Sequence, residues 1–206
     1  MKLYFTRHGE SEANVQQMFW DQPHGYGLTD RGREQARALA DSLAGVGLVA
    51  LYCSPILRAV QTAQIVGQRL NLTPEIEDAL RERDVGILEG QKISPENISL
   101  CWRITQQWMV YDNHDVRFEG GESYNDIAAR FMPFIGRLEG IYRDTEANVL
   151  LISHGQTLAT MLPHLLSNVD WAFSSTHTFD GSFYATAELR DNAWVCLRWG
   201  EEIVME

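Results

Sequence analysis

The chain has 206 residues, 45% of them hydrophobic, which suffices for one sizeable core and a single domain. Its formal net charge of −11 disfavours nucleic acid and anionic membrane surfaces as partners, because bulk electrostatics would repel both. No apolar stretch is long enough to span a bilayer, and the Met-Lys-Leu-Tyr-Phe start leaves no room for a signal peptide, so we expect a cytoplasmic protein.

The first predicted element is a short apolar strand over residues 2–6, and Thr6-Arg7-His8-Gly9-Glu10 follows at its carboxyl end. Ligands of open α/β sheets bind at that end of the strands. An imidazole at His8 could serve there as a metal ligand, a general base or a nucleophile. Arg7 points to an anionic substrate, since the planar fork of a guanidinium suits an anion. An Arg-His-Gly tripeptide also arises by chance in loops, so this run alone does not define a site.

A helix near 31–44, a strand near 49–53 and a second helix near 58–70 come next. Arg58 lies in the first turn of the second helix, where backbone N–H groups and the helix dipole favour a bound anion. It could instead simply cap or solvate that helix. The segment therefore offers a second candidate cation without proving its role.

A long helix is predicted near 123–142. It opens with Ser123 and Asp126 in the pattern of a capping box, and apolar residues recur along one side. Pro133 in its interior should cause a kink or a short break, because proline has no N–H and clashes with the preceding turn.

The apolar run 148–153 ends in His154-Gly155 and suits a strand buried on both faces of a parallel sheet. Two strands would then bring His8 and His154 to the same edge, although each could also be a buried histidine with satisfied hydrogen bonds. A helix over Thr157–Leu166 and two antiparallel strands, Ser182–Leu189 and Ala193–Trp199, should close the chain.

The alternation of strands and helices predicts a three-layer α/β/α fold, with a mostly parallel sheet and helices on both faces. Cys53, Cys101 and Cys196 are an odd number without paired or metal-binding spacing. They fit thiols in a reducing compartment better than disulfides.

Five motifs occur in order along nearly the whole chain, and together they resemble the histidine phosphatase superfamily, also called phosphoglycerate mutase-like. The motifs are Arg7-His8-Gly9-Glu10, Ser54-Pro55-x-x-Arg58-Ala59-x-Gln61-Thr62-Ala63, Leu80-x-Glu82 with Gly86 and Glu89-Gly90, Gly120-Gly121-Glu122-Ser123, and Ser153-His154-Gly155. Each motif is weak alone, and the set is specific. After Arg-His-Gly the chain continues with Glu10-Ser11-Glu12-Ala13, whereas the acid-phosphatase branch of the family continues with x-Arg-x-Pro.

The resemblance implies that His8 is a nucleophile that forms a phosphohistidine. Arg7, Arg58 and His154 would surround the phosphoryl oxygens, which makes a metal or other cofactor unnecessary. Glu82 would be the general acid, which must carry a proton in the first step. Neighbouring carboxylates leave this last assignment open; they are Glu10, Asp84 and Glu89.

Two further residues are candidate substrate contacts. Asn14 matches a family position near the phosphate, but it could be an ordinary helix-start residue. Gln156 departs from the family's usual residue after His-Gly; it could donate to a substrate oxygen or merely cap the next helix.

We expect one domain over residues 1–206, with an insertion at about 91–118 that forms a cap over the site, as in the resembling family. This insertion and the segment 19–27 are rich in aromatic residues, which would favour a ring-bearing or apolar leaving group if they line the pocket. Aromatic residues in a cap are more often its own small core.

The sequence thus predicts a metal-independent phosphomonoester hydrolase for a small phosphorylated metabolite. A phosphoglycerate-type mutase is the first alternative, since its chemistry up to the phosphoenzyme is the same. A non-catalytic phospholigand-binding protein is the second, but such a module would need neither a nucleophile nor an acid.

Overall fold

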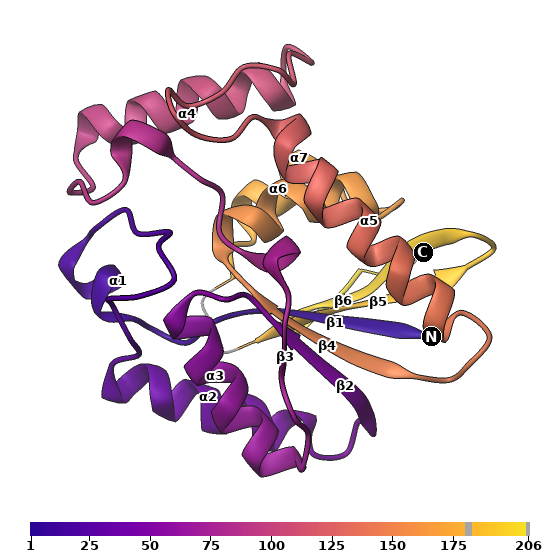
Figure 1. Ribbon diagram of the computed structural model, residues 1–206. Helices are drawn as coiled ribbons and strands as arrows, with labels where there is room; N and C mark the ends of the chain where they lie inside the picture. The colour runs from indigo at the N-terminus through magenta and orange to yellow at the C-terminus, as the bar shows by residue number, and fades with distance from the viewer. Residues whose placement is uncertain (180–182, 205–206) are drawn as a thin grey trace.

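A computed structural model describes residues 1–179 and 183–204, and a twisted seven-stranded sheet forms its centre (Figure 1). The strands lie in the order β3-β2-β4-β1-β5-β6-β7. The first four in this order are parallel, and β5, β6 and β7 each pair antiparallel with the preceding strand. Their bounds are β1 Lys2–Arg7, β2 Leu48–Cys53, β3 Glu75–Ile76, β4 Asn148–Ser153, β5 Tyr184–Arg190, β6 Ala193–Trp199 and β7 Glu202–Ile203.

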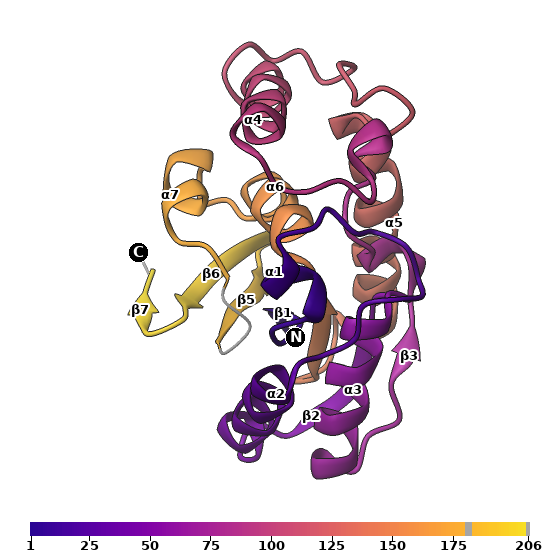
Figure 2. The same ribbon diagram turned by 90° about the vertical axis from the view of Figure 1, so that its left-hand side faces the viewer.

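Helices cover both faces of the sheet. The helices α2 and α3 lie together on one face, and α5 and α6 lie on the other (Figures 1 and 2). The helices are α1 Glu12–Gln16, α2 Asp30–Leu43, α3 Leu57–Leu70, α4 Pro95–Met109, α5 Tyr124–Tyr142, α6 Gly155–Leu165 and α7 Trp171–Thr176, with 3₁₀ turns at Asp78–Leu80 and Gly86–Leu88. The predicted three-layer α/β/α fold is confirmed.

Alternating side chains of the central strands explain this arrangement. Leu3 and Phe5 of β1 are fully buried beneath α5 and α6, whereas Tyr4 packs with the apolar sides of α2 and α3. The same alternation holds in β4, where Val149 faces one layer and Leu150 the other. A continuous apolar run is therefore what a strand between two helical layers requires.

The long helix α5 begins as expected. Ser123 is its N-cap and forms a reciprocal capping box with Asp126. The helix runs through Pro133 without the break that its interior proline suggested, because Phe131, Phe134 and Leu138 hold both halves in the core. The closing strands also form as predicted, except that Ser182 lies outside the described residues.

The segment 91–118 contains α4, which stands above the carboxyl end of the sheet (Figure 2). Within residues 1–179 and 183–204, no helix is long and apolar enough to cross a membrane. Cys53, Cys101 and Cys196 are free thiols.

Candidate active site

The carboxyl ends of β1 and β4 bring His8 and His154 together. Their ring centroids are 4.9 Å apart, and both side chains are buried. Arg58 reaches between them from the first turn of α3: its Nε donates to Nε2 of His8 at 2.8 Å, and its Nη2 to Nδ1 of His154 at 3.1 Å. Three segments remote in sequence thus meet in one cluster.

These contacts determine the tautomer of each imidazole. A guanidinium can only donate, so Nε2 of His8 is an acceptor and the ring proton sits on Nδ1, which donates to the Gly9 carbonyl at 2.6 Å. In His154 the proton sits on Nε2, which donates to Oγ of Ser54 at 2.7 Å. His8 therefore presents the lone pair of Nε2 on the side where Arg58 lies.

The electrostatic surroundings keep both rings neutral. Burial, with the charges of Arg58 and Arg7, lowers the pKa of His8 well below its ordinary value. Burial and the charge of Arg58 also lower the pKa of His154. Burial lowers the pKa of Arg58 itself to about 10, which still leaves it charged at neutral pH. A neutral imidazole beside fixed cations is suited to attack an anionic group.

Two arginine nitrogens in the cluster are buried and lack a hydrogen-bond partner in the described part of the chain. They are Nε of Arg7 and Nη1 of Arg58. Other nitrogens of these side chains are held by backbone carbonyls: Arg7 donates to Phe179 at 3.1 Å, and Arg58 to Trp20 at 2.9 Å. Because an orphaned buried N–H is costly, these donors fit an anion with several acceptor oxygens, such as a phosphoryl group.

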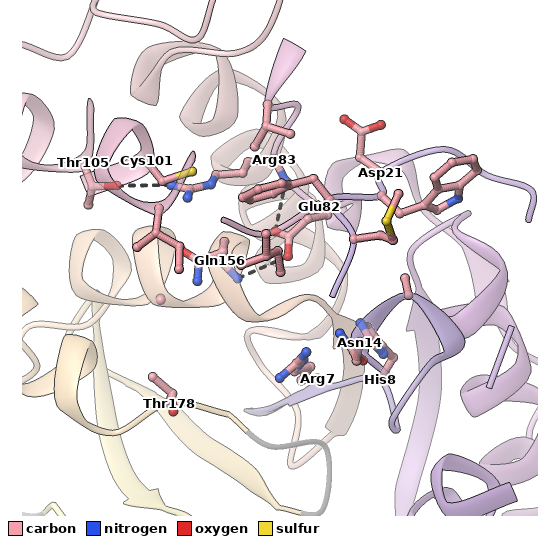
Figure 3. Close-up of a pocket in the computed structure, with 18 of the residues that line it drawn as sticks. Arg7, His8, Asn14, Asp21, Glu82, Arg83, Cys101, Thr105, Gln156 and Thr178 are labelled. Atoms are coloured by element: carbon pink, nitrogen blue, oxygen red, sulfur yellow. Dashed lines mark hydrogen bonds between the residues drawn. The ribbon is translucent and has the colours of Figure 1, made fainter. Parts of the chain in front are cut away.

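Glu82 lies in the same cavity, next to the amino end of α6 (Figure 3). Its carboxylate accepts from the backbone N–H of Thr157 at 2.9 Å, from Oγ1 of Thr157 at 3.1 Å and from the N–H of Gln156 at 3.3 Å. The amino end of α6 thus holds the carboxyl group in the cavity that His8 also lines.

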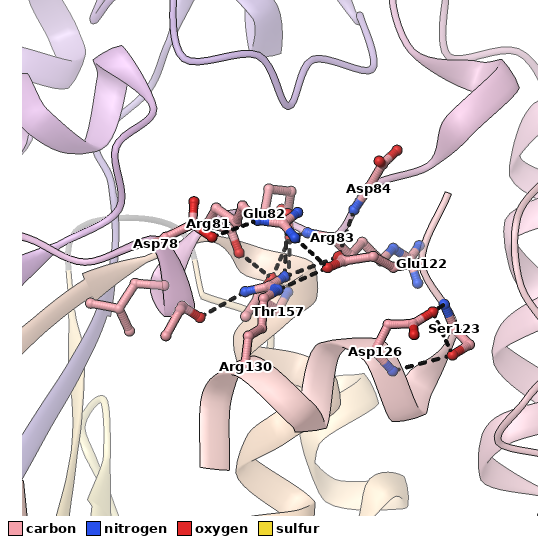
Figure 4. Close-up of polar contacts among 12 residues, drawn as sticks. Asp78, Arg81, Glu82, Arg83, Asp84, Glu122, Ser123, Asp126, Arg130 and Thr157 are labelled. Carbon is pink, nitrogen blue, oxygen red and sulfur yellow. Dashed lines mark hydrogen bonds and ion pairs between the residues drawn. The ribbon is translucent and has the colours of Figure 1, made fainter. Parts of the chain in front are cut away.

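A buried ion network holds the irregular loop that carries Glu82 (Figure 4). Glu122 accepts from Arg81 at 2.7 Å, from Arg130 at 2.9 Å and from the Asp84 N–H at 3.0 Å. Although burial alone would raise the pKa of Glu122, its bonds to Arg130 and the neighbouring charges lower it. The Gly-Gly-Glu-Ser motif therefore contributes Glu122, which positions the loop that carries Glu82.

The other carboxylates considered from the sequence lie elsewhere. Glu10 accepts from Thr29 and forms an ion pair with Arg31. Asp84 accepts from the Gly86 N–H, and Glu89 from the Asp21 N–H. Of these candidates and Glu82, only Glu82 is among the described residues that line the cavity.

Asn14 and Gln156 both line this cavity (Figure 3). The Asn14 carbonyl oxygen accepts from the N–H and hydroxyl of Ser11 in a capping box, so only its amide NH₂ remains for a ligand. The Gln156 side chain is exposed in the cavity, while its backbone N–H binds Glu82.

The cavity measures about 420 Å³ and extends from His8 to α4. Phe19, Trp20 and Trp102 line it, whereas Trp108 of α4 and Phe118 are buried in the core. Some aromatic residues of these segments therefore line the pocket, and others form the core, which are the two roles considered from the sequence. Trp171 and Arg83 also line the cavity, although the sequence did not predict it, because neither belongs to a motif or stands at a predicted strand end.

Among residues 1–179 and 183–204, no group of three or more His, Cys, Asp or Glu side chains is arranged to hold a metal ion.

Comparisons with known proteins agree with this architecture. A family model described as "Histidine phosphatase superfamily (branch 1)" matches residues 3–202. A 6-phosphofructo-2-kinase/fructose-2,6-bisphosphatase of Caenorhabditis elegans is 32% identical over 94% of this chain, and the chain spans only 40% of that relative's length. A 2,3-bisphosphoglycerate-dependent phosphoglycerate mutase of Brucella ovis is 33% identical over 78% of this chain and 79% of its own.

Solved structures show the same fold. A mycobacterial glucosyl-3-phosphoglycerate phosphatase superposes with a TM-score of 0.81 at 24% identity, covering 98% of this chain and 99% of that one. The alpha-ribazole phosphatase of Shigella flexneri gives a TM-score of 0.77 at 24% identity, covering 98% and 96%.

Proposed function

The chain belongs to the histidine phosphatase superfamily, and from this membership we propose that it is a metal-independent phosphomonoester hydrolase that works through a phosphohistidine on His8. One observation carries the proposal: a neutral His8, with its Nε2 lone pair directed at Arg58, shares a cavity with Arg7 and Glu82. The substrate is a small phosphorylated metabolite.

The first chemical step transfers the phosphoryl group to His8. When a phosphoryl oxygen accepts from Arg58, the guanidinium exchanges its bond to Nε2 for a stronger charge-assisted one, which frees the lone pair. The Nε2–P bond forms while the bond from phosphorus to the leaving oxygen breaks in line. Arg7, Arg58 and His154 stabilise the charge on the equatorial oxygens, and protonated Glu82 gives its proton to the leaving oxygen.

Water completes the reaction. The Glu82 carboxylate, now deprotonated, takes a proton from the attacking water as the Nε2–P bond breaks, so that inorganic phosphate leaves and His8 is again neutral. The exposed Asn14 and Gln156 at the cavity favour hydrolysis over mutase chemistry, because a mutase must keep water away from its phosphoenzyme. The mutase remains the second candidate function, supported by the relative from Brucella ovis.

The segment 91–118 acts in this proposal as a cap within a single domain. One face of α4 lines the cavity through residues at helical spacing, which are Ile98, Cys101, Trp102 and Thr105. The cap therefore contacts the leaving group rather than the phosphoryl group.

The test of the function is phosphate release from an aryl phosphate and from a panel of metabolite phosphates, with a chelator present and product positions followed by phosphorus NMR. We expect inorganic phosphate to appear at an undiminished rate with chelator. Transfer to a second hydroxyl of a phosphoglycerate without phosphate release would instead establish the mutase. Loss of activity with chelator would contradict the metal-independent mechanism.

Glu82→Gln tests the general acid. For an alkyl phosphate we expect a loss in kcat/KM of about 10² to 10⁴, because the poor leaving group needs the proton. For an activated aryl phosphate the loss should be much smaller. Glu10→Gln is the matched control, since its carboxylate pairs with Arg31 outside the cavity. Equal losses for both substrates in Glu82→Gln would assign the acid role to another group.

A further inference from the structure

Arg83 is a buried cation at the cap end of the cavity. Its side chain is 4% exposed and lines the same cavity as His8 and Glu82. In Figure 3 it reaches toward α4, where Cys101 and Thr105 lie. The proposed catalytic steps make no use of it.

The hydrogen bonds of Arg83 are incomplete. Nη1 donates to Oγ1 of Thr105 at 3.3 Å, whereas Nε is buried and has no partner among the described residues. The guanidinium also makes a side-chain hydrogen bond with Cys101, so Nε is its one buried nitrogen without a partner in the described part of the chain. Side-on, Nε and Nη2 form the edge of the guanidinium that binds a carboxylate through two parallel hydrogen bonds.

The charge of Arg83 is only partly compensated. Burial lowers its pKa, the charges of Cys101 and Glu82 oppose that shift, and no ion pair joins its guanidinium to a carboxylate among residues 1–179 and 183–204. The rings of Trp108 and Phe118 flank it at 5.8 and 5.2 Å from their centroids, which offsets part of the desolvation. An unpaired buried charge remains costly, so the surroundings favour an anion that arrives with the ligand.

From this geometry we infer that Arg83 is a specificity-determining residue that binds a carboxylate on the leaving group of the substrate. The inference rests on the proposed function and narrows its substrate class to phosphomonoesters with a second, carboxylate-bearing end. Beyond Arg7 and Arg58, Arg83 is the one cationic side chain among the described lining residues, which matches a monoanion better than a second phosphate.

Apolar side chains line the cavity together with its cations, among them Ile98 and Trp102 of the cap. The substrate class is accordingly a molecule with an ester phosphate, a short apolar body and a carboxylate.

A matched pair of substrates tests this inference: meta-carboxyphenyl phosphate and meta-carbamoylphenyl phosphate, which have the same shape and differ in charge. We expect the wild type to prefer the carboxylate by about 10- to 100-fold in kcat/KM, the range of a charge-assisted hydrogen bond. Arg83→Met should reduce this ratio to about one while retaining turnover of the carbamoyl ester. Arg103→Met is the control, because it removes an exposed cation from α4, the helix that carries Thr105, and should preserve the ratio.

The outcomes separate the two proposals. Turnover without a preference for the carboxylate, or an unchanged ratio in Arg83→Met, overturns the role of Arg83 and leaves the hydrolase intact. Without turnover of either ester, the hydrolase fails, and binding of the same pair to the His8→Ala protein by calorimetry still decides whether Arg83 recognises the carboxylate. A preference for a bisphosphate over the carboxylate would assign a phosphate to Arg83 instead and overturn the inference.

A purely structural role has a different signature. If Arg83 served only to pack against Trp108 and Phe118, Arg83→Met would lower Tm and leave the substrate ratio unchanged. Arg83→Lys keeps the charge without the planar fork, and we expect it to retain only part of the preference. It also provides a second variant should the methionine variant fail to fold.

Discussion

Replacing His8 by alanine is expected to abolish phosphate release from every substrate, by roughly five to six powers of ten, the scale seen when a nucleophile is removed. The physical reason is the loss of the Nε2 lone pair, for which the surrounding arginines and Glu82 offer no substitute. The measurement is steady-state phosphate release by the purified variant, with far-UV circular dichroism to show that the fold is intact.

The matched control for His8 is His24→Ala, which removes an exposed imidazole outside the cavity and should leave turnover unchanged. Rapid quenching of wild-type enzyme with labelled substrate should also trap an acid-labile phosphoenzyme, as expected for a P–N bond. Wild-type turnover by His8→Ala would sink the phosphohistidine mechanism. If the wild type is as inactive as the folded variant, and the variant still binds phosphate, the non-catalytic alternative would be supported.

Arg58→Ala should lower kcat/KM by about two to four powers of ten, comparable with the loss of a donor from an oxyanion hole. Arg58 contacts both His8 and His154 and keeps one further nitrogen for the phosphoryl group. Its removal therefore costs charge stabilisation and the alignment of two imidazoles together. Kinetics on an aryl phosphate and an alkyl phosphate measure the loss.

The pH dependence of Arg58→Ala provides a second readout. Burial is the largest cause of the lowered pKa of His8, and the charge of Arg58 is the next largest. Removing that charge therefore raises this pKa. Protonated His8 cannot attack, and the residual activity should thus fall off at a higher pH on the acid side than in the wild type. Arg69→Ala is the control, because Arg69 is an exposed residue of the same helix that pairs with Asp41. An unshifted acid limb would show that Arg58 does not act on His8.

The local elements of this protein follow from its sequence because their causes are local. The apolar run of β4 and the Ser123 capping box of α5 depend on residues within a few positions of one another. Parallel strands end at one edge of their sheet, which is why sequence alone placed His8 and His154 near each other.

Only the tertiary structure decided which side chains enter the cavity. Glu82, Arg83 and Asp84 are consecutive in an irregular loop, yet Glu82 meets the α6 amino end, Arg83 is buried beneath the cap, and Asp84 lies outside. Likewise Trp102 lines the cavity, while Trp108 is core. No local periodicity sets these directions, because they depend on contacts with remote residues such as Glu122 and Arg130, whose side chains hold the loop through a buried ion network.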